Sequence, residues 1–370
     1  LRDKAMTNAA ITGWGKCLPP GTLTNSELAE FVETDDEWIV SRTGMKERRI
    51  THVPVSELAY VACERALAAA GKKAEDVGLI IFGSCTPDEG VPNTASRVQK
   101  LMGADNAACM DLNTACTSGM YSLSVANSMI SSGVVDSALV IGAEGIGHVM
   151  DWSNRNVAIL FGDGAAAFYL DKTNKEEGVL TESLGCFGNS REILDVKGLG
   201  VGKSNQGWQL GVTEWNFEGQ EIFKKAVAGM GKASSTAMEK AGVTIDDIDL
   251  VVPHQANIRI IEALGKRLKV PSEKVFVNIE RYGNMSAATA PVALVEAIEE
   301  GHVKPGSKIL MPAFGGGLTW SSHVIQWGER THPIATSDVQ LPPCDKTGVE
   351  LVREIVAQRA AGQKKMMAKD

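Results

Sequence analysis

Cys116 is the residue whose type and position best suit nucleophilic chemistry. It stands in residues 112–121, where a short apolar run is followed by apolar residues at helical spacing. A helix N-terminus presents unpaired N–H groups and partial positive charge, and both lower the pKa of a thiol. A small buried cysteine is the alternative. We therefore expect a reactive thiol only if other functional side chains converge on Cys116.

His254 and Asn284 are the candidate partners, although both lie far downstream. His254 follows an apolar run at 249–253, and Asn284 lies in a glycine-containing turn ahead of another apolar helical pattern. Taken singly, such a histidine is more often a satisfied core residue, and such an asparagine a turn residue. Their joint occurrence with Cys116 favours a catalytic interpretation.

The composition restricts the class of protein. At 370 residues, two core units are expected. Lys and Arg number 37 against 45 Asp and Glu, a net charge of −8 that argues against general nucleic-acid binding. The seven cysteines include no Cys-x-x-Cys pair, and the histidines have no metal-binding spacing. No apolar run could cross a bilayer. We therefore expect a cytoplasmic globular protein with reduced thiols, no metal and no membrane segment.

The elements that must position these residues alternate between strands and helices, which is typical of a layered α/β protein. Capping boxes at 24–27 and 34–37 predict two short helices, the second carrying Trp38 and Arg42. Longer helices are expected at 56–70, 93–102, 217–241, 257–268 and 286–300. Strands are expected at 9–14, 78–84, 107–113, 138–143, 162–170, 249–253, 275–278, 308–313 and 318–327. Residues 186–216, rich in glycine and polar residues, are expected to form a surface loop or flap.

The order of these elements indicates an internal duplication. Residues 75–81 resemble 246–252, and residues 116–119 match 284–287, so that Cys116 and Asn284 fall at the same place, each just before a helix. Two related halves packed face to face would bring Cys116, His254 and Asn284 to their junction. The expected units are 6–178 with the nucleophile, 179–330 with the histidine and asparagine, and a C-terminal extension at 331–370.

Two glycine-rich stretches do not match nucleotide-binding motifs. The stretch 198–204 has a lysine where a phosphate loop requires its first glycine, and 142–147 lacks the dinucleotide spacing. We expect no bound nucleotide cofactor.

Six motifs resemble the β-ketoacyl-acyl-carrier-protein synthase III family and occur in its order. They are DDEWIVSRTG at 35–44, NTACTSG at 113–119, FGDGA at 161–165, PHQANIR at 253–259, YGNMSA at 282–287 and AFGGGLTW at 313–320. The resemblance covers residues 9–328. It implies an α/β, thiolase-like, five-layered αβαβα fold with internal duplication, in a homodimer.

The resemblance also implies a reaction. Cys116 would take the acyl group from an acyl-CoA, and malonyl-acyl-carrier-protein would then lose CO₂ and condense with that acyl group to start fatty-acid synthesis. His254 and Asn284 would donate hydrogen bonds to the enolate oxygen. The backbone N–H groups of Cys116 and Gly316 would form a second oxyanion hole. No cofactor is expected besides the two thioester substrates.

Substrate contacts follow from the same resemblance. Trp38 and Arg155 would flank the CoA adenine, Arg42 would meet its phosphates, and Asn257 would lie near the pantetheine arm. Val91 stands where some members carry a bulky aromatic that closes the partner subunit's acyl pocket, so a deeper pocket is expected.

A cluster of basic residues around 257–268 favours docking of an acidic acyl carrier protein. It consists of Arg259, Lys266, Arg267 and Lys269. A solvated helix face is the alternative.

Two other functions remain open at this point. One is an acyltransferase or a condensing enzyme of secondary metabolism with the same fold. The other, from a different class, is a non-catalytic acyl- or CoA-binding scaffold, which predicts an unreactive Cys116. The extension carries an apolar helical face of Leu351, Val352, Ile355 and Val356, whose docking partner the sequence does not specify.

Overall fold

The computed structural model of the chain describes residues 8–199 and 213–367, and side chains as far as residue 361. The first residues of the expected first unit and most of the 198–204 stretch lie outside these ranges. Among the described helices, none has the length and apolar character needed to span a membrane.

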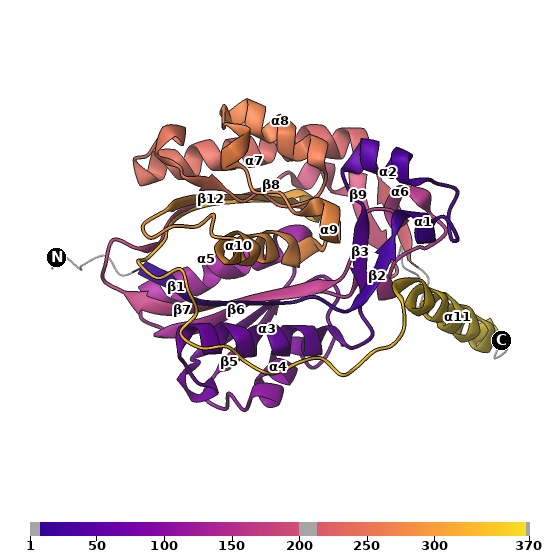
Figure 1. Cartoon of the computed structure of the whole chain (residues 1–370), viewed down its shortest axis with the longest axis horizontal. Coiled ribbons are helices and arrows are strands. Elements are labelled where there is room, and N and C mark those ends of the chain that lie inside the picture. The colour runs from indigo at the N-terminus through magenta and orange to yellow at the C-terminus, as the bar shows by residue number, and fades with distance from the viewer. Residues whose placement is uncertain (1–7, 200–212, 368–370) are drawn as a thin grey trace.

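Five layers are stacked in the body of the molecule (Figure 1). Helices α7 and α8 cover the outer face of one sheet, α5 and α10 lie between the two sheets, and α3 and α4 cover the outer face of the other. Their bounds are Gly219–Ala241 (α7), Ile258–Leu268 (α8), Ser118–Ser131 (α5), Thr289–Glu299 (α10), Val55–Ala70 (α3) and Thr94–Met102 (α4). The expected αβαβα order is confirmed.

The two sheets share one topology. The first has the order β1-β7-β6-β4-β5, with antiparallel pairs at β1-β7 and β7-β6 and parallel pairs beyond. The second has the order β8-β13-β12-β11 with the same sequence of antiparallel and parallel pairs. The bounds are Asn8–Cys17 (β1), Gly164–Thr173 (β7), Ser137–Glu144 (β6), Leu79–Gly83 (β4), Ala108–Leu112 (β5), Gly178–Cys186 (β8), Thr319–Gln326 (β13), Lys308–Gly315 (β12) and Leu250–Val251 (β11).

The prediction of a strand at 275–278 in the second sheet is wrong. Residues 275–278 form no strand, and only Val275 makes an isolated parallel bridge, to Val251. This bridge stands at the edge where the first sheet has β5, so the duplicated pattern is retained in reduced form.

The register of the duplication differs from the one read from the sequence. Asn113 and Asn284 each accept a hydrogen bond from the backbone N–H two residues on, at 3.0 and 2.8 Å. Ser118 and Thr289 each donate a hydroxyl hydrogen bond to the carbonyl three residues back, at 2.7 and 2.8 Å. Asn284 therefore corresponds to Asn113. The residue that corresponds to Cys116 is Ala287, and the expected match of Cys116 with Asn284 is wrong.

The halves meet closely at the start of the middle helices. A Cβ on Gly142 would lie 2.3 Å from the Ala287 carbonyl oxygen, and one on Gly119 would lie 2.6 Å from it. Only glycine fits there without moving backbone. Residues 289–298 of α10 are all buried, as expected for a helix between two sheets.

A smaller lobe stands beside the layers. It contains the antiparallel pair β2-β3 (Gly21–Thr24 and Glu47–Ile50), the helices α1 (Asn25–Leu28), α2 (Asp36–Thr43) and α6 (Arg155–Ala158), and the antiparallel pair β9-β10 (Leu194–Lys197 and Glu214–Phe217).

Three local expectations in this region change. The capping box at Thr24 is confirmed, but the N-cap of α2 is Asp35 rather than Thr34, because the Asp35 carboxylate accepts from the Trp38 N–H at 2.7 Å. Residues 186–216 are not simply a loop, since β9 and β10 pair within the described part of that stretch. The long helix α7 begins at Gly219, because Phe217 still belongs to β10.

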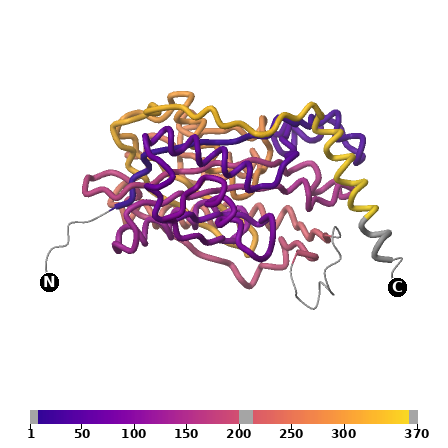
Figure 2. The backbone as a smooth tube through the Cα atoms, turned by 90° about the horizontal axis from the view of Figure 1, so that it is seen from below, coloured from indigo at the N-terminus to yellow at the C-terminus, as the bar shows by residue number. Residues whose placement is uncertain are grey.

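The C-terminal extension crosses the molecule before it ends in a helix. Backbone N–H groups of Ile334 and Ala335 donate to the carbonyls of Ala69 and Ala68 at the end of α3. Helix α11 (Gly348–Met367) then docks beside β2 and β3, where Leu351, Val352 and Ile355 are buried and Val356 is not. Figure 2 shows this path from below. The extension therefore packs on its own chain.

Candidate active site

Cys116, His254 and Asn284 line one cavity of about 790 Å³. Cys116 lies in a 3₁₀ turn, Ala115–Thr117, just before α5. His254 follows β11, and Asn284 follows the short helix α9 (Ile279–Tyr282). The two halves therefore contribute side chains to the same space, as the duplication predicted.

The backbone around Cys116 is tightly enclosed. Ala115 has a φ of 53°, and a Cβ on Gly315 would lie 2.7 Å from the Cys116 nitrogen. Burial raises the pKa of the Cys116 thiol to about 11, although hydrogen bonds from Ser286, from its own backbone N–H and from Asn284 lower it. The expectation of a lowered thiol pKa is therefore wrong. Desolvation raises the pKa of Cys116 more than its position before a helix lowers it.

His254 is held from two sides. Its backbone N–H donates to the Pro312 carbonyl at 2.8 Å, and its Nδ1 pairs with the Thr289 hydroxyl. The Thr289 hydroxyl also lies 2.8 Å from the Ser286 carbonyl, to which it can donate. Burial lowers the pKa of His254 to about 3, so the ring is neutral. Thr289 has one hydroxyl proton, which can go either to His254 Nδ1 or to the Ser286 carbonyl. His254 carries its own proton on Nε2 only when the Thr289 proton points to Nδ1.

The Asn284 amide has a fixed direction. Its backbone is pinned between Leu160 and Gly162, with N···O distances of 2.9 and 3.1 Å. Its side-chain Oδ1 accepts from the Ser286 N–H at 2.8 Å. The acceptor end of the amide is therefore occupied, and the NH₂ end hydrogen-bonds toward the Cys116 sulfur.

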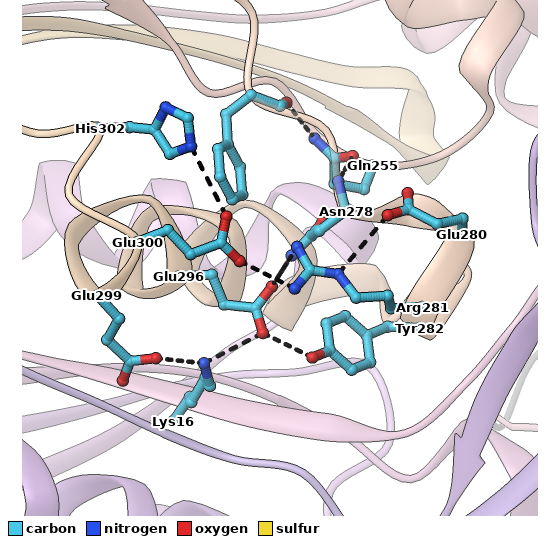
Figure 3. Close-up of polar contacts among 11 residues, drawn as sticks. Lys16, Gln255, Asn278, Glu280, Arg281, Tyr282, Glu296, Glu299, Glu300 and His302 are labelled. Carbon is cyan, nitrogen blue, oxygen red and sulfur yellow. Dashed lines mark hydrogen bonds and ion pairs between the residues drawn. The ribbon is translucent and has the colours of Figure 1, made fainter.

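A buried polar cluster clamps the segments that carry His254 and Asn284 (Figure 3). Gln255, next to His254, accepts from the Asn278 N–H at 3.1 Å. The Asn278 amide and the Tyr282 hydroxyl donate to the buried Glu296 at 2.9 and 2.6 Å. Since Asn278 and Tyr282 flank α9, this cluster fixes the approach of the chain to Asn284.

Cations complete the charge balance of this cluster. Lys16 and Arg281 lie 3.1 Å from Glu296, and Lys16 also reaches Glu299 at 2.5 Å. Burial raises the pKa of Glu296, but the Lys16 charge and the hydrogen bonds outweigh it, and the net pKa is lowered. Glu296 therefore remains a carboxylate inside the fold.

The cavity mouth combines one aromatic ring with guanidinium groups. Arg42 and Arg155 each lie 4.7 Å from the Trp38 ring centre. Trp38 and Arg42 line the cavity, and Arg155, which also donates to the Glu33 carbonyl at 3.1 Å, stands beside them. This pairing of a π surface with positive charge fits an anionic nucleotide.

Helix α8 supports that mouth. Asn257 is its N-cap, and its amide also donates to the Arg42 carbonyl at 3.1 Å. The Arg259 guanidinium donates to the Ser41 carbonyl at 2.7 Å. Arg259 therefore ties α8 to α2. The other basic residues of the expected docking cluster, Lys266, Arg267 and Lys269, are exposed and form no ion pair within the described part of the chain.

Of the two remaining predicted site residues, Gly316 lies beside the nucleophile and Val91 lies on the surface. Gly316 begins the turn after β12, and a Cβ on it would lie 3.4 Å from Ala115, next to the nucleophile. Val91 is 90% exposed and does not line the cavity of its own chain.

Sequence reasoning missed several residues near the nucleophile: Glu144, Ser286 and Thr289. Ser286 lies inside a motif that was recognised, so position in a motif was the available signal. Glu144 gave no signal beyond a carboxylate at the end of a buried strand. No group of three or more metal-ligating side chains occurs among the described residues.

Comparisons with known proteins agree with this geometry. Residues 110–188 match the family model for 3-oxoacyl-acyl-carrier-protein synthase III, and residues 238–327 match the model for its C-terminal part. β-Ketoacyl-acyl-carrier-protein synthase III 2 of Vibrio cholerae is 48% identical over 94% of this chain and 96% of its own length.

Solved structures show the same similarity. The crystal structure of 3-oxoacyl-acyl-carrier-protein synthase III from Aquifex aeolicus is 41% identical, with a TM-score of 0.81 over 86% of this chain and 100% of that chain. A polyketide-pathway priming β-ketosynthase is 30% identical, with a TM-score of 0.82 over 89% of this chain and 99% of that chain. The resemblance seen in the motifs is confirmed, and the chain belongs to the β-ketoacyl-acyl-carrier-protein synthase III family of condensing enzymes.

Proposed function

We propose that the chain joins an acyl-CoA primer to malonyl-acyl-carrier-protein through an acyl intermediate on Cys116. The observation that carries this proposal is the single cavity lined by Cys116, His254 and Asn284, with Trp38 and Arg42 at its mouth. One group can form a thioester, two can hydrogen-bond an oxyanion, and the mouth suits a nucleotide.

Acylation uses the mouth and the floor of the cavity. Trp38 and Arg155 hold the adenine, Arg42 meets the phosphates, and Asn257 lies along the pantetheine arm. The Cys116 sulfur attacks the thioester carbon while the N–H groups of Cys116 and Gly316 stabilise its oxygen. The carbon–sulfur bond to CoA breaks, and CoA leaves as a thiolate.

Condensation uses His254 and Asn284. The malonyl carboxylate leaves as CO₂, and its bonding electron pair becomes an enolate whose oxygen accepts hydrogen bonds from the Asn284 NH₂ and from His254 Nε2–H. The Nε2–H tautomer forms when the single Thr289 hydroxyl proton turns from the Ser286 carbonyl to His254 Nδ1. The enolate carbon attacks the acyl carbon and releases the Cys116 thiolate. No electron is gained or lost overall, so the chemistry requires no redox cofactor.

The partners follow from these substrates. An acyl carrier protein is the second substrate, and the exposed Lys266, Arg267 and Lys269 offer it a positive surface. A homodimer would cover the exposed Val91 and place it at the partner's acyl pocket. We place the enzyme in the cytoplasm, and we divide the chain into units at 6–178, 179–330 and 331–370, close to where β8 begins the second sheet.

Mass spectrometry of the intact protein with acyl-CoA tests the intermediate. We expect one acyl adduct, lost in Cys116→Ala, and formation of a β-ketoacyl product only with the wild-type nucleophile. An adduct that persists in Cys116→Ala would refute the assignment.

Priming of secondary metabolism is the second candidate, because a polyketide priming synthase has the same fold at 30% identity. Initial rates with a panel of acyl-CoA primers and carrier proteins separate the two. A strong preference for a carrier from a polyketide system would favour the second candidate.

A further inference from the structure

Glu144 is a buried carboxylate without a role in the chemistry described above. It ends β6 and has no exposed surface. Its Oε2 accepts from the hydroxyls of Ser84, at 3.1 Å, and Thr86. Its Oε1 accepts from the N–H and thiol groups of Cys85 at 3.1 and 3.3 Å, and from the Ala287 N–H at 3.3 Å. Its hydrogen-bond partners within the described chain include no cation, which is an unusual state for a buried carboxylate.

Ser286 connects this carboxylate to the nucleophile. The Ser286 hydroxyl is 1% exposed and donates to Glu144 Oε1 at 2.9 Å. The turn that holds Ser286 packs against the turn that holds Cys116, and a hydrogen bond from the Ser286 side chain lowers the pKa of the Cys116 thiol. The Ser286 hydroxyl also lies 3.7 Å from the Cys85 sulfur. Because a hydroxyl has one proton, a Ser286 that donates to Glu144 offers a lone pair to the Cys116 thiol. Cys116, Ser286 and Glu144 therefore form a continuous chain from thiol to hydroxyl to carboxylate.

We propose that Glu144 accepts the Cys116 proton through Ser286 during acylation and returns it when condensation releases the thiolate. As the sulfur attacks the thioester, its S–H bond breaks and the proton passes to Ser286, whose own proton passes to Glu144. CoA leaves as a thiolate and takes a proton from solvent. After condensation, the reverse transfer restores the Cys116 thiol. This inference rests on the proposed acyl-Cys116 intermediate.

The electrostatics favour this acceptor over His254. Transfer to Glu144 moves one negative charge from carboxylate to sulfur, whereas transfer to His254 creates two charges in a desolvated cavity. Burial raises the pKa of Glu144 more than its hydrogen bonds lower it, while the pKa of His254 is lowered to about 3. Cys85 and Cys116 are the titratable groups that face Glu144. His254 is thereby left neutral and able to donate.

Glu144→Gln separates this role from a purely electrostatic one. The Glu144 charge by itself raises the pKa of Cys116, so a charge without a relay predicts faster acylation in Glu144→Gln. The relay predicts slower acylation, by on the order of 100-fold, because glutamine cannot accept the proton. Single-turnover release of CoA from acyl-CoA measures this step without the carrier protein.

Two further variants and one control complete the test. Ser286→Ala keeps the carboxylate but interrupts the chain, and should slow acylation as Glu144→Gln does. Glu144→Asp keeps an acceptor and should recover part of the rate. Ser84→Ala removes a donor on the other side of the carboxylate and should stay within a few-fold of wild type.

The pH profile gives an independent signature. A protonated Glu144 cannot accept a proton, so wild-type acylation should fall as pH drops through the raised pKa of Glu144. This acid limb should be absent in both Glu144→Gln and Ser286→Ala. Acylation at or above the wild-type rate in either variant, or an unchanged acid limb, overturns the relay. If wild-type Cys116 is not acylated at all, the proposed function itself fails. If Glu144→Gln does not fold, Ser286→Ala decides the question.

Discussion

His254 and Asn284 reach the cavity with different capacities. The Asn284 amide cannot titrate, and its Oδ1 is occupied by the Ser286 N–H, so only its NH₂ end can serve a substrate. His254 can donate or accept at Nε2, depending on the Thr289 hydroxyl. The two proposed donors to the enolate oxygen therefore differ in chemistry, and the rates of single variants can separate their contributions.

We predict that Asn284→Ala and His254→Ala slow condensation by about 100-fold or more while acylation of Cys116 falls far less. One lost oxyanion donor typically has an effect of this size. Single-turnover CoA release measures acylation, and malonyl-dependent CO₂ release measures condensation. If a variant slowed acylation and condensation equally, its residue would act in acylation rather than as a donor to the enolate.

At this scale the sequence predicted the reactive groups and missed their environment. Cys116, His254 and Asn284 were found because each lies in a specific motif. The thiol's pKa direction was wrong, since burial by Gly315 and by segments of the second half cannot be read from residues near Cys116. Glu144 was missed because its partner Ser286 is far away in sequence, and only the fold brings them together.

At the scale of elements, the cluster around Glu296 determines how α9 and α10 present Asn284. Glu296 is 3% exposed. It forms ion pairs with Lys16 and Arg281 and accepts hydrogen bonds from Asn278 and Tyr282. Its pKa is lowered in the folded state, so its stabilisation is present above the unfolded value and declines as pH falls below about 4.5.

We predict that Glu296→Gln lowers the free energy of unfolding at pH 7 by about 3 kcal/mol, because it leaves buried cationic partners without a carboxylate. The difference from wild type should shrink on acidification. Urea denaturation at pH 7 and near pH 4 measures both. Glu300→Gln is the control, since this more exposed partner of Arg281 should matter by about 1 kcal/mol or less. An equal loss at both pH values would contradict the ionised state of Glu296.

Helix α8 carries two groups of polar residues, one at each end. Its N-terminal residues, Asn257 and Arg259, hold α2 at the cavity mouth, while Lys266, Arg267 and Lys269 remain exposed. The proposed docking surface is therefore narrower than the sequence suggested, because Arg259 already has a structural partner.

We predict that Lys266→Glu with Arg267→Glu raises the KM for malonyl-acyl-carrier-protein about tenfold or more, with acylation by acyl-CoA unchanged. Opposite charge accelerates association, and the effect falls with salt. Lys73→Glu with Lys100→Glu makes the same charge change beside the opposite outer layer and should leave this KM unchanged. Equal KM values in wild type and in the Lys266 and Arg267 variant would exclude the surface.

At the scale of the whole molecule, the exposed Val91 acquires a role only beside a second subunit. Its side chain is 90% exposed in one chain. In the proposed dimer it would limit the partner's acyl pocket, where each additional buried methylene of a substrate gains about 0.8 kcal/mol.

We predict that Val91→Phe lowers kcat/KM for octanoyl-CoA far more than for acetyl-CoA. The larger ring would fill the space that a longer chain needs. Val134→Phe, at another exposed valine, is the control and should change neither value. A wild type that rejects every primer longer than butyryl-CoA, or an equal fall for both primers, would show that Val91 does not set the depth.

The five-layered fold was predictable because its periodic elements and its motifs pointed the same way. The expected strand at 275–278 failed because one bridge to Val251 is all that remains of a fifth strand there. The apolar helical face of the extension could be predicted from its periodicity. Its docking beside β2 and β3 could not, because periodicity does not specify which surface the face packs against.

The shared register of the halves also describes how such an enzyme could diverge from a symmetric ancestor. The separation between Leu79 and Leu250 equals that between Asn113 and Asn284, so Gly83 stands where the second half has His254, and Ala287 where the first has Cys116. Each half therefore lacks the reactive residue that the other supplies. Two identical halves would build two equivalent sites or none, whereas one fused and diverged chain assembles a single site with one nucleophile. A single composite site therefore requires that the two halves differ at these two positions.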